Sequence, residues 1–199
     1  MDRFTFEKTD ISGVYVVTPK KIIDNRGYYE RFFCSDEFKE LGFTDTVKQI
    51  NHSQTTSKGV IRGFHYQKPP YCEMKLVRCI NGSIFDVALD LRKDSPTFMK
   101  HFSCELTSTN GTYLLIPEGV AHAFQTTSDL SEILYIVNKK YTPSSDVAIN
   151  PMDPTIHVKW PLNVNKELSK ELKAPLISQD FQGIDVWYFF THVFSCECK

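Results

Sequence analysis

Short β-type runs separated by turn residues dominate the chain from residue 12 to about residue 160. β-branched and aromatic residues fit a pleated, half-buried sheet, whereas Gly, Asn, Asp and Pro supply turn conformations. The clearest runs are 14–17, 75–80, 83–91, 112–116 and 133–137. Many short strands with turns at regular spacing are typical of a sandwich or a closed barrel. We therefore predict a mostly β fold.

Local signals refine this prediction at three places. Asn81-Gly82 joins two alternating runs, which is the strongest hairpin signal in the chain. Residues 35–41 read as a short helix with Ser35 as N-cap and an acidic first turn, and residues 165–173 read as another.

The bulk properties place the chain among ordinary globular proteins. Its 199 residues suit one domain, so we expect residues 1–199 to form a single domain. Residues from about 180 to 199 form a divergent tail with an aromatic run at 186–190. A net charge of −1 gives no sign of a nucleic-acid partner, and no run approaches the roughly 20 apolar residues of a membrane span. The start lacks signal-peptide features and six cysteines need no disulfides here, so we expect a cytoplasmic protein with reduced thiols.

Polar residues in apolar strands are the candidate site residues, because burying them without partners costs free energy. Arg62 and His65 share one strand-like run, Lys75 opens a second, and His122 follows a Pro-Glu-Gly turn in a third. A lone strand histidine is more often structural than catalytic, but the clustering around His65 favours function. Arginine forks suit phosphate, so Arg26 and Arg62 are candidate phosphate ligands or partners in internal ion pairs.

Together these stretches resemble the dTDP-4-dehydrorhamnose 3,5-epimerases, cupin-fold enzymes of deoxysugar biosynthesis. The matching stretches, in family order, are 24–30, 49–53, 59–67, 75–78, 86–98, 116–124, 153–156 and 160–161. The resemblance implies a cupin-type double-stranded β-helix, or jelly-roll barrel, with a few short helices. It also implies C3 and C5 epimerisation of a nucleotide-diphospho-4-keto sugar without metal or cofactor, by a homodimer with exchanged N-terminal strands.

Carried over by residue, the resemblance makes His65 the general base, Tyr135 the general acid and Lys75 the stabiliser of the enolate oxygen. Tyr141 takes the position of an aromatic that stacks on the nucleotide base, and Asp146 stands where the family usually carries a glutamate. The remaining residues implied to contact sugar and diphosphate are Arg26, Tyr28, Glu30, Gln49, Asn51, Arg62 and His122.

The chemistry explains these residue types. Hydrogens on C3 and C5 are acidified because both carbons flank the C4 ketone, and a histidine titrates in the range suited to removing them. The enolate needs a donor or positive charge at the C4 oxygen, which Lys75 supplies. Inversion requires a proton from the other face, so acid and base must face each other across the ring.

The segment 168–175 departs from the family pattern by being one residue shorter. In the family an aspartate here pairs with the catalytic histidine. Counting back from Ala174-Pro175 places Glu171 at that position, whereas counting forward from Leu168-Ser169 places Leu172 there. A glutamate can orient the imidazole and a leucine cannot.

Three other interpretations stay open. Relatives that invert C3 alone keep the same His and Tyr. A metal-dependent cupin enzyme could use His65, Glu73 and His122, although Gln67 replaces the second histidine of the usual His-x-His. An inactive sugar-binding protein of the same fold is the third.

Overall fold

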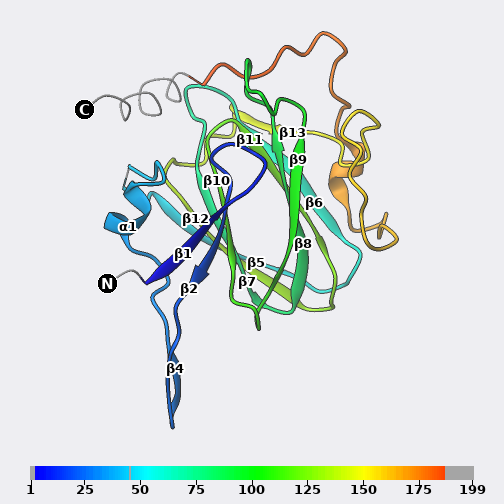
Figure 1. Ribbon diagram of the computed structural model, residues 1–199. Coiled ribbons are helices and arrows are strands. Elements are labelled where there is room, and N and C mark those ends of the chain that lie inside the picture. The colour runs from blue at the N-terminus through cyan, green and yellow to red at the C-terminus, as the bar shows by residue number, and fades with distance from the viewer. Residues whose placement is uncertain (1–2, 45, 187–199) are drawn as a thin grey trace, which may run out of the picture.

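The computed structural model describes residues 3–44 and 46–186, which form two facing antiparallel sheets and one separate hairpin (Figure 1). The strands are β1 (Phe4–Lys8), β2 (Tyr15–Pro19), β3 (Ile22–Asp24), β4 (Gly27–Tyr29), β5 (Gln49–Thr55), β6 (Ile61–Gln67), β7 (Lys75–Asn81), β8 (Ser83–Asp90), β9 (His101–Thr107), β10 (Tyr113–Ile116), β11 (Val120–Thr126), β12 (Ser131–Val137) and β13 (Asp146–Ala148). The described helices are α1 (Ser35–Lys39) and a 3-10 turn, η1 (Lys170–Lys173).

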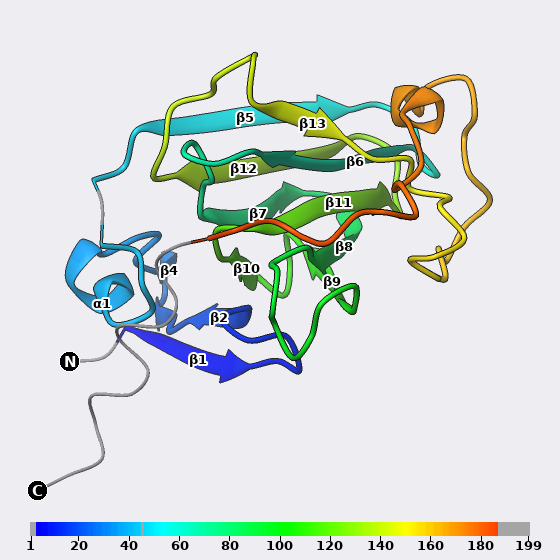
Figure 2. The same ribbon diagram turned by 90° about the horizontal axis from the view of Figure 1, so that it is seen from above.

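The chain alternates between the two sheets. One sheet has the order β1-β2-β10-β7-β12-β5 and the other β13-β6-β11-β8-β9, so successive strands from β5 to β8 and from β9 to β13 cross the barrel. Figure 2 shows the two layers from above, with β5 and β13 near one another at the same side of the barrel. This is the double-stranded β-helix predicted above, and that prediction is confirmed.

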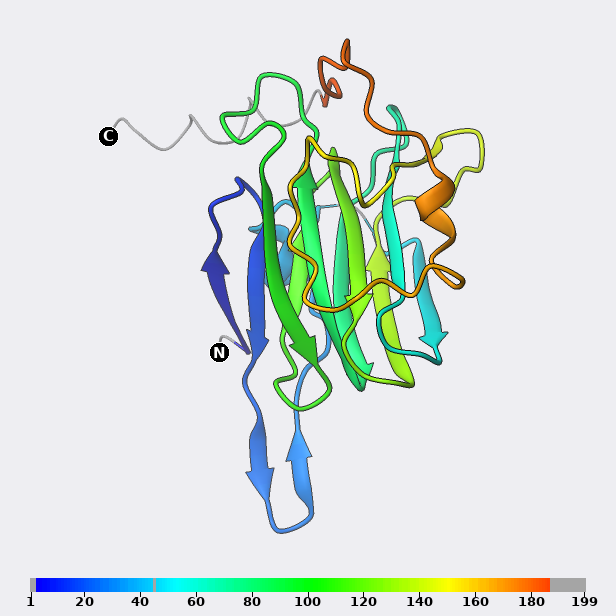
Figure 3. The ribbon, with the colours of Figure 1, turned by 90° about the vertical axis from the view of Figure 1, so that its right-hand side faces the viewer.

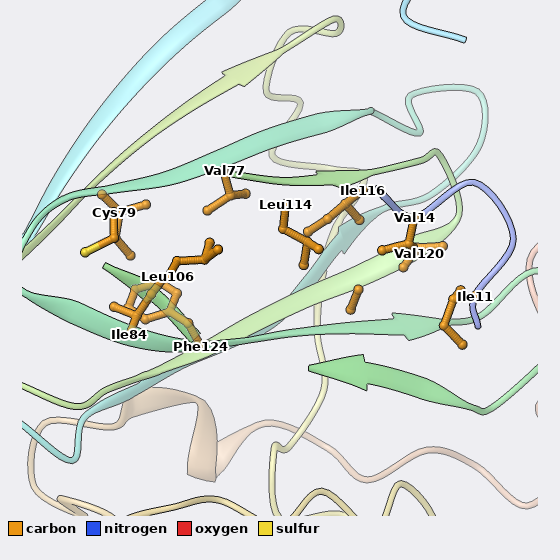
Figure 4. Packing of buried hydrophobic residues seen from close by; sticks show 12 residues of the cluster. Ile11, Val14, Val77, Cys79, Ile84, Leu106, Leu114, Ile116, Val120 and Phe124 are labelled. Atoms are coloured by element: carbon orange, nitrogen blue, oxygen red, sulfur yellow. The ribbon is translucent and has the colours of Figure 1, made fainter. Parts of the chain in front are cut away.

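The main core lies between the sheets (Figure 4). Val77 and Leu114 come from the six-stranded sheet, and Ile84 and Phe124 from the five-stranded sheet. Side chains alternate along a strand, so every second residue of these strands points into the same interior. Polar residues at interior positions therefore mark the candidate site.

The outer faces of both sheets are covered as well. Helix α1 buries Phe38 against the outer face of the six-stranded sheet, beside Leu76 and Tyr113. Across the other sheet, the segment that follows β13 covers Phe64 and Leu89 (Figure 3). Because both faces are buried, β6 and β8 are apolar on their outward positions.

Three local predictions need correction. Asn81-Gly82 forms no hairpin: β7 pairs with β10 and β12, whereas β8 pairs with β9 and β11. Gly82 (φ 73°) turns the chain from one sheet into the other, and a Cβ there would meet the Ser128 hydroxyl at 2.5 Å. The first predicted helix spans only Ser35–Lys39 with Cys34 as N-cap, and the second is only the 3-10 turn η1.

Beyond the barrel, the β3–β4 hairpin projects away from both sheets, and its Ile23 and Tyr28 side chains are exposed (Figure 1). Of the predicted aromatic run at 186–190, only residue 186 lies within the described part of the chain. Among the described residues, no helix has the length and apolar character needed to span a membrane.

Candidate active site

His65 lies on the interior side of β6. Its neighbours Phe64 and Tyr66 pack in the cluster outside the five-stranded sheet, so the imidazole between them points the other way, toward the space between the sheets. In the ladder it stands opposite His122 of β11 and Ala148 of β13. The side chain is 36% exposed, which leaves it accessible to a small molecule.

Glu171 is the partner of His65. The Nε2 atom of His65 lies 3.1 Å from Oε1 of Glu171, which η1 holds over β6. The Ile61 amide donates to the Ser169 hydroxyl at 3.0 Å, tying the start of η1 to the same strand. Burial alone would raise the pKa of Glu171, but the bond with His65 and its charge lower it overall. Of the two residues left open by the sequence, Glu171 is therefore the one placed against His65, while the Leu172 carbonyl accepts from Asn150.

A second carboxylate approaches the other ring nitrogen of His65. Nδ1 lies 3.7 Å from Oδ1 of Asp146, the first residue of β13. The Tyr141 hydroxyl donates to Oδ2 of Asp146 at 3.1 Å, and this bond raises the pKa of Tyr141. The Tyr141 amide donates to the Gln49 side chain at the start of β5. The loop between β12 and β13 thus bridges the two sheets at the mouth of the site.

Tyr135 stands on the opposite wall, in the six-stranded sheet. In the ladders it pairs with Asn51 of β5 and with Val77 of β7, and its ring packs on the interior core cluster. Burial raises the pKa of Tyr135; the nearby Glu73 charge adds to the rise and Arg62 opposes it. The phenol is therefore held in its protonated form well above neutral pH.

Lys75 shares that wall. It alternates with Val77 and Cys79 on the interior side of β7. Its ammonium lies 3.0 Å from Oε1 of Glu73, with both side chains about nine-tenths buried. The other Glu73 oxygen accepts from Gln67 of β6 at 3.0 Å.

Arg62 and His122 complete the polar lining. Arg62 is opposite Phe124 of the interior cluster, and its charge lowers the pKa of both Tyr135 and Glu171. The His122 Nε2 atom lies 2.7 Å from Oδ1 of Asp86, whose side chain is fully buried. Asp86 was not predicted from the sequence. Side chains alternate between the two faces of a strand, so the position of Asp86 in the run 83–91 could have shown that this charged residue faces the interior.

Three predicted binding residues lie away from these polar residues between the sheets. Arg26 and Tyr28 are on the projecting hairpin, where Arg26 forms an ion pair with Asp24 across the turn at 2.6 Å. Glu30 pairs with Arg78, which points to the outer side of the six-stranded sheet beside Tyr113. Within one chain these three side chains do not line the space between the sheets.

The residues that a metal-dependent enzyme would use as ligands have other partners in this structure. Glu73 pairs with Lys75 and His122 with Asp86. In the described part of the chain, no three His, Cys, Asp or Glu side chains are grouped so as to hold a metal ion.

Comparison with known proteins shows to which family the chain belongs. The sequence model of the dTDP-4-dehydrorhamnose 3,5-epimerases matches residues 8–179. The chain belongs to the dTDP-4-dehydrorhamnose 3,5-epimerase family. The dTDP-4-dehydrorhamnose 3,5-epimerase of Shigella flexneri is 43% identical over 187 residues, covering 92% of this chain and 97% of that protein.

Solved structures agree with this membership. A family enzyme from Legionella pneumophila, dTDP-6-deoxy-D-glucose-3,5-epimerase in complex with dTDP-4-keto-L-rhamnose, superposes with a TM-score of 0.83 at 33% identity, covering 92% of this chain and 99% of that one. A 3′-monoepimerase from Streptomyces bikiniensis, in complex with dTDP-quinovose, gives 0.77 at 27% identity, covering 85% and 86%. The fold is thus common to enzymes named for double and for single inversion.

Proposed function

We propose that this chain inverts C3 and C5 of a dTDP-linked 4-keto-6-deoxy sugar through an enolate. The observation that carries the proposal is the opposition of His65, paired with Glu171 on one sheet, to Tyr135 on the other. Epimerisation needs a base on one face of the ring and an acid on the other, and in this proposal His65 and Tyr135 supply them.

His65 is the general base in this account. It removes the proton from C3 or C5, and the Glu171 carboxylate fixes the ring orientation and stabilises the imidazolium that forms. Lys75 stabilises the negative charge that develops on the C4 oxygen. Tyr135 then delivers a proton from the opposite face. The raised pKa of Tyr135 suits this role, because the phenol is still protonated when the enolate forms.

The rest of the lining suits the nucleotide and the diphosphate. Tyr141 is 57% exposed at the mouth, where a nucleobase can stack on its ring. Arg62 presents a guanidinium that can pair with phosphate oxygens. Asn51 and His122 face the interior beside Tyr135 and His65, at the place the sugar would occupy.

Arg26 and Tyr28 fit the proposal through a second copy of the chain. The projecting hairpin leaves Ile22, Ile23, Tyr28 and Tyr29 exposed, and an extended apolar arm of this kind favours association. We propose a homodimer in which the hairpin brings Arg26 and Tyr28 to the partner's substrate, and a cytoplasmic location where nucleotide sugars are made.

Proton NMR of dTDP-4-keto-6-deoxyglucose incubated with the protein in heavy water tests the proposal. We expect deuterium at both C3 and C5. Deuterium at C3 alone would establish the single epimerase, which the similarity to the Streptomyces 3′-monoepimerase keeps as the second candidate. Absence of exchange with dTDP-, GDP- and CDP-linked 4-keto sugars would contradict an epimerase and leave a sugar-binding protein.

A further inference from the structure

Glu73 is a buried carboxylate that the proposed mechanism does not use. Its side chain is 11% exposed, on the segment just before β7, and its two oxygens have different partners. Oε1 lies 3.0 Å from the Lys75 ammonium, and Oε2 accepts from the Gln67 amide at 3.0 Å. The carboxylate therefore joins the two walls of the site.

Gln67 makes this link rigid. It is 2% exposed, and besides Glu73 its amide nitrogen donates to the carbonyls of Tyr71 and Lys140, both at 3.2 Å. Its oxygen accepts from the Thr142 amide at 2.6 Å. With both ends of the amide engaged by backbone, Gln67 holds the Glu73 carboxylate in one place.

The position of Glu73 decides where the Lys75 ammonium points. A lysine side chain has four rotatable carbons and three N–H donors, so nothing in β7 alone fixes its head group. One donor directed to Glu73 anchors the ammonium on the interior side of the strand and leaves the others to meet a substrate oxygen. Burying an ion pair costs desolvation free energy, so stability alone is a weak reason for a carboxylate here.

Glu73 also acts on Tyr135, which lies beside Lys75 on the same wall. The charges that act on the phenol are those of Glu73, on the segment just before β7, and of Arg62, on β6 of the facing sheet. Lys75 on β7 and His65 on β6 belong to the same two walls. Glu73 is the negative charge that opposes ionisation of the phenol, while Arg62 favours it.

We propose that Glu73, held by Gln67, is a positioning residue for the epimerase reaction: it aims the Lys75 ammonium at the C4 oxygen and keeps Tyr135 a proton donor. This inference rests on the function proposed above. It assigns Glu73 an effect on two groups that touch the substrate, not contact with the substrate itself.

Glu73→Gln tests the inference, since the amide retains an acceptor for Gln67 and removes the charge. We expect kcat to fall about 10- to 100-fold with KM changed less than about threefold, because a small misplacement of a catalytic group costs that much. We also expect the alkaline limb of the kcat profile to move to lower pH. Glu132→Gln is the matched control, because Glu132 pairs at 2.9 Å with His52 on the outer side of the same sheet.

A second readout is independent of turnover. NMR of protein with ¹³Cζ-labelled tyrosine, with Tyr135 assigned from Tyr135→Phe, reports the phenol titration directly. We expect Glu73→Gln to lower the Tyr135 midpoint and Glu132→Gln to leave it unchanged. Glu73→Asp, which keeps the charge but is shorter, should hold the midpoint near wild type while lowering kcat, and it serves if Glu73→Gln fails to fold.

The outcomes separate the two proposals. An unchanged Tyr135 midpoint, or unchanged kcat and pH profile with only a lower Tm, would overturn the role of Glu73. A wild-type protein that exchanges no sugar proton would overturn the proposed function instead, and the midpoint would still decide whether Glu73 controls Tyr135.

Discussion

The His65 imidazole and the Glu171 carboxylate lie 3.1 Å apart, although 106 residues separate them in the chain. The contact exists because Ser169 binds the backbone of β6 and places η1 at the mouth of the barrel. A carboxylate against one ring nitrogen fixes the tautomer, so the other nitrogen is the one that receives a proton. The pair therefore prepares His65 to act as a base.

Glu171→Gln should reduce kcat on the order of 100-fold while changing KM little, because an amide stabilises the imidazolium poorly. Steady-state kinetics with the 4-keto sugar measures this. Glu167→Gln is the control, since Glu167 is exposed four residues earlier. Equal kcat for wild type and Glu171→Gln would show that the pair has no catalytic role.

Asp90 should govern acid stability. It is fully buried and accepts bonds from Arg92 at 2.7 Å and from Thr97 at 2.6 Å. Burial alone would raise its pKa, but the bonds from Arg92, Ser95 and Thr97 lower it overall. A lowered folded-state pKa contributes stability above the ordinary value of about 3.9, and this contribution is lost as the pH falls below it.

Asp90→Asn should therefore cost about 3–5 kcal/mol of unfolding free energy at neutral pH, because it removes the negative charge from a buried, hydrogen-bonded ion pair. The difference from wild type should shrink as the pH falls below about 4, because Asp90 then becomes protonated in the unfolded wild-type chain while its lowered pKa keeps it ionised in the folded one. Urea unfolding between pH 7 and pH 2.5 measures both effects. Asp10→Asn, at an exposed position, is the control and should have no comparable effect. If the difference in stability between wild type and Asp90→Asn stayed constant with pH, Asp90 would not be the group that governs acid stability.

Gly63 allows β6 and β11 to approach closely beside His65. A Cβ at this residue would lie 2.3 Å from the His122 carbonyl oxygen and 2.7 Å from the Ala123 Cα. Gly27 also has a positive φ (131° against 101°), but no atom of the residues that the structure describes lies within 4 Å of its Cβ position. Gly63→Ala should thus lower the unfolding free energy by about 1–3 kcal/mol more than Gly27→Ala does, as chemical denaturation would reveal. Equal losses of unfolding free energy would contradict this prediction, because they would mean that β11 moves away from the added methyl group without loss of stability.

Strand positions were predictable because β-branched runs mark them locally, as at 75–80 and 133–137. Which strands pair with one another was not predictable from these runs. Asn81-Gly82 has the composition of a hairpin turn, yet it carries the chain between sheets, since pairing depends on strands that are distant in sequence. The Ser35 helix prediction failed by one residue at its N-cap and by two at its end, where fraying helices are hardest to delimit.

The site was predictable to the extent that residue types and family resemblance identify it. His65 and Tyr135 were predicted in this way, and the fold places them on opposing sheets. The choice between Glu171 and Leu172 required the three-dimensional contact with His65. The link from Gln67 through Glu73 to Lys75 had no sequence signal, because a carboxylate's partner across a barrel leaves no local pattern.

Deuterium NMR of the 4-keto sugar with Tyr135→Phe and with His65→Ala tests whether these two residues act on opposite faces of the sugar ring. We expect Tyr135→Phe to exchange the sugar protons with retained configuration, because His65 removes and returns them on one face. We expect His65→Ala neither to exchange nor to invert, while His52→Ala, altered on the outer side of the sheet, behaves as wild type. Normal inversion by His65→Ala would show that His65 is not the base.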